Sequence, residues 1–119
     1  CHGLLTQFLI DKDNRLHMST IQRSADVGLG LPHNWISYSI LQIMIARVCG
    51  LIPGELTYFV NDLHIYNNHL EALIKMESKT YSNPYVEVDN LESIDDYTME
   101  HIRLYDYESG PKIKLEMAV

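Results

Sequence analysis

An arginine, a serine and two glycines lie close together in one short stretch of this chain, Gln22-Arg23-Ser24-Ala25-Asp26-Val27-Gly28-Leu29-Gly30-Leu31-Pro32-His33-Asn34. A guanidinium offers a planar fork of N–H donors that matches phosphate oxygens, and Ser24 adds a hydroxyl beside it. Gly28 and Gly30 have no Cβ atom, so the backbone can approach a ligand closely. The stretch indicates an anion site, but an ordinary loop with one exposed arginine would show the same local pattern.

The histidines and cysteines suggest two further kinds of site, a metal centre and a thiol nucleophile. A helical zinc site pairs histidines four residues apart, whereas His64 and His69 are five apart, and the chain has no Cys-x-x-Cys pair. We therefore expect no metal. Cys1 offers a nucleophile, but the adjacent His2 would point to the opposite face of an extended strand and is a poor base for that thiol.

Composition limits the class of protein. The chain has 119 residues, of which 46% are hydrophobic, and this fits one soluble domain with its own core. Its formal net charge of -7 argues against non-specific DNA binding but not against a small phosphate ligand. No apolar run reaches the roughly 20 residues of a transmembrane helix, and no secretory signal opens the chain. We expect a cytoplasmic protein without a membrane partner.

The elements that would position the stretch 22–34 follow from hydrophobic patterning. Residues 3–10 and 16–21 predict a β-hairpin around a polar turn. Residues 34–49 are apolar on almost every face, which predicts a helix enclosed in the middle of a domain. Gly50 is expected to terminate that helix.

The second half of the chain alternates between the same two kinds of pattern. We expect strands at 55–60 and 84–88 and helices at 70–79 and 97–104. Residues 112–119 alternate between apolar and polar side chains, as a strand would. Together the elements predict an α+β fold, with a mixed sheet and packed helices.

Several motifs together resemble the thymidylate synthase family closely: Cys1-His2, the stretch 22–34, His64-Ile65-Tyr66 and the final Glu116-Met117-Ala118-Val119. The resemblance runs nearly end to end, yet it covers only what would be the C-terminal half of the family's single domain, beginning at its catalytic cysteine. It implies that residues 1–119 are a partial thymidylate synthase-like domain. The start at Cys1 would reflect a partial sequence, a split gene or a splicing product.

The resemblance implies reductive methylation of dUMP to dTMP, with 5,10-methylenetetrahydrofolate as co-substrate. Cys1 matches the nucleophile that adds to C6 of the uracil ring and makes C5 nucleophilic. In the family, the N-terminal half and a homodimer partner supply further residues of the site. This chain alone is therefore expected to be inactive.

Other positions match the family's binding residues. Gln22 matches a substrate-binding residue beside the cysteine sulfur, and Asp26 matches a position whose backbone contacts the nucleotide. The side chains expected to bind the nucleotide are Arg23 and Ser24 at the phosphate, Asn34 at the base, and His64 and Tyr66 at the sugar 3′-hydroxyl. The expected folate contacts are Asp26, Leu29, Gly30, His33, Tyr66 and the terminal Val119, which closes over the folate. His33 departs from the family's usual phenylalanine, and Asn61 stands where glycine is usual.

Two other functions fit the same residues. A dUMP or dCMP hydroxymethylase would complete the reaction with water instead of hydride. A non-enzymatic fragment would only bind nucleotide or pair with another half. The Met-Ala-Val ending and Asn34 favour methylation.

Overall fold

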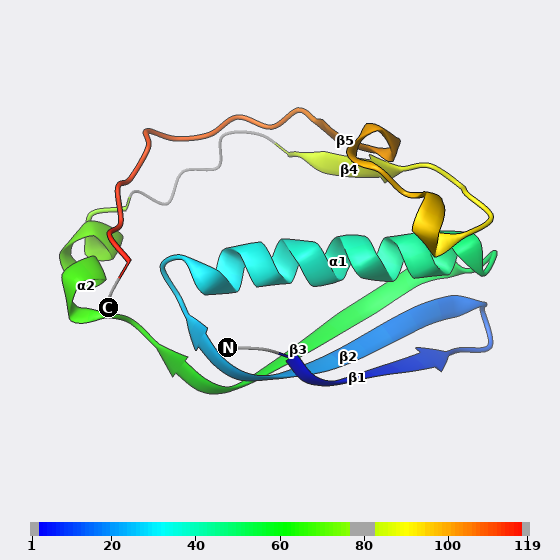
Figure 1. The fold of residues 1–119 in the computed structure, drawn as a ribbon, viewed down its shortest axis with the longest axis horizontal. Coiled ribbons are helices and arrows are strands. Elements are labelled where there is room, and N and C mark those ends of the chain that lie inside the picture. The colour runs from blue at the N-terminus through cyan, green and yellow to red at the C-terminus, as the bar shows by residue number, and fades with distance from the viewer. Residues whose placement is uncertain (1–2, 77–82, 118–119) are drawn as a thin grey trace.

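The structure, a computed structural model, describes residues 3–76 and 83–117, and in them a three-stranded sheet and a two-stranded sheet accompany two α-helices. The elements in chain order are β1 (Gly3–Ile10), β2 (Arg15–Asp26), α1 (Gly30–Val48), β3 (Ile52–His64), α2 (Asn67–Ile74), β4 (Tyr85–Val88) and β5 (Ile102–Tyr105), with 3-10 helices at Ile94–Asp96 and Met99–His101. Helix α1 lies between the two sheets (Figure 1). The predicted α+β fold is confirmed.

Strand β2 is the central strand of the larger sheet, whose order is β1-β2-β3. The predicted hairpin is confirmed: β1 and β2 are antiparallel, and Asn14 in their turn adopts a φ of 58°. Strands β2 and β3 are parallel, and α1 is the crossover between them. The carboxyl ends of β2 and β3 therefore meet at one edge of the sheet, beside the first turn of α1 (Figure 1).

The core lies between α1 and one face of the larger sheet. Alternate side chains of β2 point into it and are almost wholly buried, namely Leu16, Met18, Thr20 and Gln22. Strand β3 shows the predicted alternation, with Leu56, Tyr58 and Val60 less exposed than Thr57 and Phe59. It begins earlier than predicted, at Ile52.

Helix α1 begins earlier than its pattern predicts, at Gly30 instead of residue 34. Pro32 is consequently in the first turn, where its missing N–H costs no helical hydrogen bond. The other end fits the prediction, because Gly50 follows the helix with a φ of 65°, in the left-handed region that glycine adopts readily.

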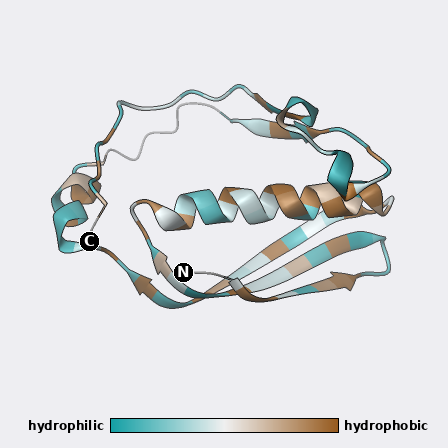
Figure 2. Cartoon of the chain, in the orientation of Figure 1, coloured by the Kyte–Doolittle hydropathy of each residue, from teal (hydrophilic) through white to brown (hydrophobic). Residues whose placement is uncertain are grey.

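The prediction that α1 is enclosed on all sides is wrong for this chain. Trp35 is 51% exposed and Ile36 is 59% exposed. The larger sheet covers one side of the helix, while β4 and the first 3-10 helix touch it elsewhere. Figure 2 shows apolar residues along both α1 and the strands of the larger sheet. The helix therefore keeps an uncovered apolar flank.

The region after β4 differs from its prediction. The expected helix 97–104 is replaced by a 3-10 turn and by β5, which pairs antiparallel with β4. Cross-strand contacts favour the strand: the guanidinium of Arg103 pairs with Asp89 and lies 3.4 Å from a carboxylate oxygen of Glu87. Pairing between distant segments thus outweighs local helical periodicity.

The remaining boundaries shift as well. The helix predicted at 70–79 is α2, Asn67–Ile74, and residues 77–79 lie outside the described part. Strand β4 confirms the prediction at 84–88. Residues 112–117 do not form the predicted strand, and residues 118–119 are outside the described part.

Gln42 joins α1 to the sheet from within the core. Its side-chain amide donates to the carbonyl oxygens of Leu16, at 2.8 Å, and Glu55, at 3.1 Å. These carbonyls flank the place where the register of β2 against β3 shifts. The side chain thus donates to one carbonyl on each of two neighbouring strands and joins α1 to both of them.

We expect Gln42→Met to destabilise the folded protein by about 1–3 kcal/mol, because methionine has a similar shape but cannot donate to either carbonyl. Chemical denaturation would show a lower midpoint with an unchanged slope. Arg47→Met, on the exposed side of α1, is the matched control and should shift stability by less than about 0.5 kcal/mol. Equal stability of the two variants would contradict this role for Gln42.

Candidate active site

The candidate site lies at the carboxyl ends of β2 and β3, where open parallel sheets bind their ligands. Register places Ser24 opposite Asp62 and Asp26 opposite His64. Residues almost forty positions apart in the chain are thereby brought side by side. The first turn of α1 and the start of α2 border the same edge (Figure 1).

Gln22 is the buried centre of the site. Its side-chain N–H donates to the carbonyl of Ser24 at 2.6 Å, and its Oε1 accepts from the Asn34 amide at 3.2 Å. The hydroxyl of Tyr58 donates to the same Oε1. Burial, with a smaller effect of Tyr38, raises the pKa of Tyr58, so that hydroxyl stays a donor. Gln22 therefore fixes which way Asn34 presents its amide.

Asn34 is part of α1 and does not cap it. The N-cap position belongs to Leu29, whose side chain makes no capping bond. One N–H of the Asn34 amide is held by Gln22. The Oδ1 acceptor and the second N–H remain for a ligand that presents a donor beside an acceptor.

Ser24, Asp62 and His64 form a polar cluster at the edge of the sheet. The Ser24 hydroxyl donates to Asp62 at 3.1 Å, and His64 Nδ1 is 3.5 Å from both the Ser24 Oγ and the Asp62 carboxylate. Tyr66 follows β3 and directly precedes α2, yet its ring contacts His64 edge-on, with centroids 5.1 Å apart. The structure thus brings three predicted residues together: Ser24, His64 and Tyr66.

Asp26 shapes the loop between β2 and α1. Its two carboxylate oxygens accept from the backbone N–H groups of Gly28 and Leu29, each at 3.0 Å. Burial acts to raise the pKa of Asp26, but these two hydrogen bonds and the nearby His69 outweigh it and lower the pKa below its usual value. Asp26 is therefore ionised at neutral pH.

Three of the predicted folate residues lie on the same loop or in the first turn of α1, namely Leu29, Gly30 and His33. No described atom would come within 4 Å of a Cβ built on Gly30, so open space lies over it. His33 is exposed, and its Nδ1 is 2.7 Å from the carbonyl of Leu29. Arg23 is exposed and alternates with the buried Gln22 along β2, so it points away from that side chain. Cys1 and Val119 lie outside the described residues.

Three residues that the sequence did not single out for this site belong to it: Tyr58, Asp62 and His69. The sequence indicated Tyr58 only as part of an alternating strand, and Asp62 only as a residue close to the His64-Ile65-Tyr66 motif, so neither carried a functional signal. His69 was considered in the sequence only as a metal ligand together with His64, and the structure shows that it is fully buried. Within residues 3–76 and 83–117 there is no group of three His, Cys, Asp or Glu side chains that could hold a metal ion.

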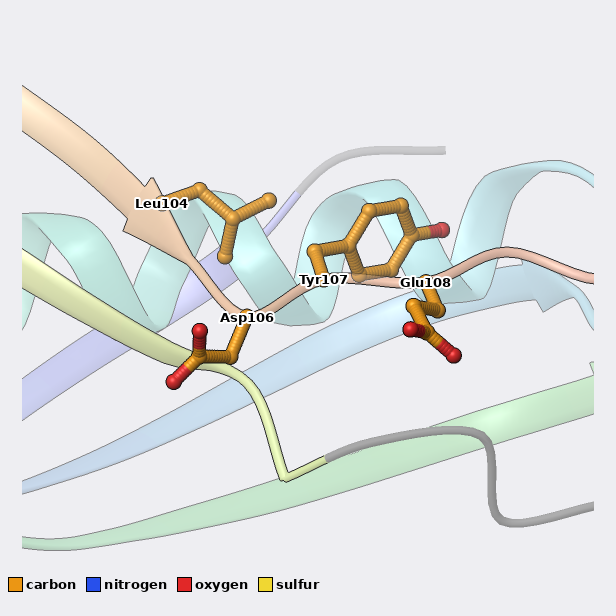
Figure 3. A pocket seen from close by; sticks show the side chains of 4 residues that line it. All are labelled: Leu104, Asp106, Tyr107 and Glu108. Carbon is orange, nitrogen blue, oxygen red and sulfur yellow. The ribbon is translucent and has the colours of Figure 1, made fainter.

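A separate hollow of about 740 Å³ lies beyond the end of β5. Figure 3 shows its lining side chains, Leu104, Asp106, Tyr107 and Glu108. Two of the four are carboxylates, which would repel a phosphate. None of the predicted site residues lines this hollow, so it is not the candidate site. Of the described helices, none combines the length and apolar character that a membrane span requires.

Comparison with known proteins gives a consistent result. The thymidylate synthase family model matches residues 1–119. A thymidylate synthase of Symbiobacterium thermophilum is 42% identical over 120 residues, which cover 99% of this chain and 42% of that protein. The enzyme of the same name from Saimiriine herpesvirus 2 is 43% identical over 122 residues, all of this chain and 40% of that protein.

The fold comparison agrees with the sequence comparison. Thermostable thymidylate synthase A from Bacillus subtilis superposes with a TM-score of 0.89 at 34% identity, over 96% of this chain and 41% of that one. This chain spans about two fifths of the length of these relatives. The match over the whole chain, the shared fold and the cluster at the ends of β2 and β3 together show that the chain belongs to the thymidylate synthase family.

Proposed function

We propose that this chain is the C-terminal half of a thymidylate synthase, which converts dUMP to dTMP with 5,10-methylenetetrahydrofolate as the carbon donor and reductant. The observation that carries the proposal is the amide of Asn34, which Gln22 holds at the edge where Ser24, His64 and Tyr66 also meet. These residues match the family's nucleotide contacts. Family membership and the shared fold support the same assignment.

The nucleotide roles follow from the chemistry of each side chain. Arg23 and Ser24 bind the phosphate, while His64 and Tyr66 hold the 3′-hydroxyl of the sugar. Uracil presents an N3–H donor beside an O4 acceptor, and Asn34 offers a carbonyl and an N–H in matching order. Gln22 keeps Asn34 in that orientation.

Cys1 is the proposed nucleophile. Its thiolate adds to C6 of the uracil ring, and C5 then attacks the one-carbon unit of the folate. This addition needs the thiolate form, which positive charge near the sulfur would favour. Gln22 borders the sulfur in this arrangement.

The folate roles fall on the loop after β2 and on the chain's last residues. The ionised Asp26 accepts hydrogen bonds from the ligand, while Leu29, Gly30, His33 and Tyr66 line the pocket. Val119 closes over the folate. No metal takes part in this proposal.

Two uncovered apolar surfaces support an assembly with further chain. Leu5, Ile21 and Phe59 are neighbours across the three strands, and all three are exposed on the sheet face away from α1. We assign this face to the homodimer contact. The uncovered flank of α1, with Trp35 and Ile36, is assigned to the N-terminal half of the fold. Without the N-terminal half and the dimer partner, the isolated chain is expected to be inactive.

The assembly is tested by expressing the chain alone and with the N-terminal part of a thymidylate synthase relative. Alone, the chain should aggregate or lack cooperative unfolding, because its apolar faces remain open to water. Co-expression should restore solubility and a single thermal transition. A dispersed, cooperatively unfolding monomer from this chain alone would contradict the proposal.

Cys1→Ser tests covalent catalysis in the assembled enzyme. Turnover should fall by more than about a hundredfold, because a neutral hydroxyl adds to the ring poorly without a base. Binding of dUMP should survive, as measured by calorimetry. Cys49→Ser, an exposed thiol at the far end of α1, is the control. Activity retained within a hundredfold of the parent would remove Cys1 from the mechanism.

Asn34→Asp tests the choice of pyrimidine. The new carboxylate cannot donate to uracil O4, and it faces Gln22 Oε1 as a second acceptor. One unpaired buried group costs about 1–3 kcal/mol, so the preference for dUMP over dCMP should fall about 5- to 150-fold.

Turnover of both nucleotides measures this ratio, and product analysis separates methylation from the hydroxymethylase alternative. Asn90→Asp makes the same charge change at an exposed position and is the matched control. An unchanged ratio in Asn34→Asp would show that Asn34 does not read the base.

A further inference from the structure

His69, in the first turn of α2, is fully buried between two segments of the candidate site. Its Nε2 is 2.6 Å from the carbonyl oxygen of Glu116, in the C-terminal segment 112–117. Its Nδ1 is 3.6 Å from a carboxylate oxygen of Asp26 and has no hydrogen-bond partner among the described residues. The ring is thus placed between the C-terminal segment and the loop after β2.

Both ring nitrogens of His69 face groups that only accept hydrogen bonds. The carbonyl of Glu116 requires a proton on Nε2, and the ionised carboxylate of Asp26 would accept one from Nδ1. A neutral imidazole has a single N–H, so it would leave a bare Nδ1 buried beside a negative charge. The Asp26 carboxylate is thus the group toward which Nδ1 is directed, at a distance slightly longer than a hydrogen bond.

The surroundings of the ring offer no other partner for Nδ1 in the described structure. Gly28 packs against it so closely that a Cβ there would lie 2.9 Å from Nδ1, which leaves no room for water or ligand on that side. Tyr66 presents its ring edge-on, with centroids 5.7 Å apart. The side chains of Lys114 and Glu116 pair with each other at the surface. The positive end of the α2 helix dipole has only a weak effect on the ring. Among the residues that the structure describes, Asp26 is the one acceptor near Nδ1.

We propose that His69 is a positioning residue: its buried ring lies between the carboxylate of Asp26 and the backbone carbonyl of Glu116 and joins the two. It thereby couples the C-terminal segment to the loop that forms the folate side of the site. The coupling to folate rests on the proposed function, but the link between the two segments does not.

The coupling is tested by hydrogen exchange in the C-terminal segment, with Asn68→Ala as the matched control. Asn68 donates to the same carbonyl of Glu116, at 3.0 Å, but does not contact Asp26. His69→Gln loses the imidazole contacts to both Glu116 and Asp26, so exchange at 115–117 should speed up by about tenfold or more, against about fivefold for Asn68→Ala. Equal effects of the two variants would overturn the coupling.

Enzyme kinetics then separate this inference from the proposed function. His69→Gln should raise KM for the folate more than it lowers kcat, while KM for dUMP stays unchanged. If the assembled protein has no thymidylate synthase activity but the exchange result holds, the proposed function fails and the bridge remains. If activity is present and the two variants speed exchange equally, only the bridge fails.

Discussion

Parallel pairing of β2 with β3 is the constraint on which the rest of the structure depends. Parallel strands need a long connection, and α1 supplies it by crossing one face of the sheet. Once the register places Asp26 beside His64, both strand ends and the first turn of α1 must share one edge. The site is therefore a consequence of topology, since no single segment contains it.

Buried amides hold this arrangement in place at two levels. Gln42 ties α1 to the irregular end of the ladder, and Gln22 ties the first turn of α1 to the opposite end. Both side chains are almost wholly buried and hydrogen-bonded, as buried polar groups must be. A helix fixed at both ends by directional bonds cannot slide along the sheet, so Asn34 keeps its place over the strand ends.

Sequence pattern correctly predicted the elements whose conformation depends on neighbouring residues along the chain. The hairpin, the alternation of β3 and the end of α1 at Gly50 all follow from turn chemistry and periodicity. The segment 97–104 was predicted wrongly because pairing with β4, reinforced by Arg103, decides its conformation. The exposure of Trp35 was likewise beyond local pattern, since it depends on which other segments pack on α1.

Within the site, residue types predicted which side chains gather at one edge better than the hydrogen bonds that these side chains make to one another. Ser24, His64 and Tyr66 were expected together and lie together. The hold of Gln22 on Asn34 and the burial of His69 were not expected, because an amide or imidazole gives no sequence signal for the partner that it finds in the fold. The roles of Cys1 and Val119 stay predictions, since both lie outside the described residues.

The two sides of the site are built in physically different ways. The nucleotide side rests on paired strands and on α1, whose backbone groups are bonded within regular elements. The folate side consists of the loop 27–29, the short helix α2 and the segment 112–117, which forms no strand. Segments with few regular hydrogen bonds open most easily. His69 contacts two of them at once, so it joins segments that no shared strand or helix connects.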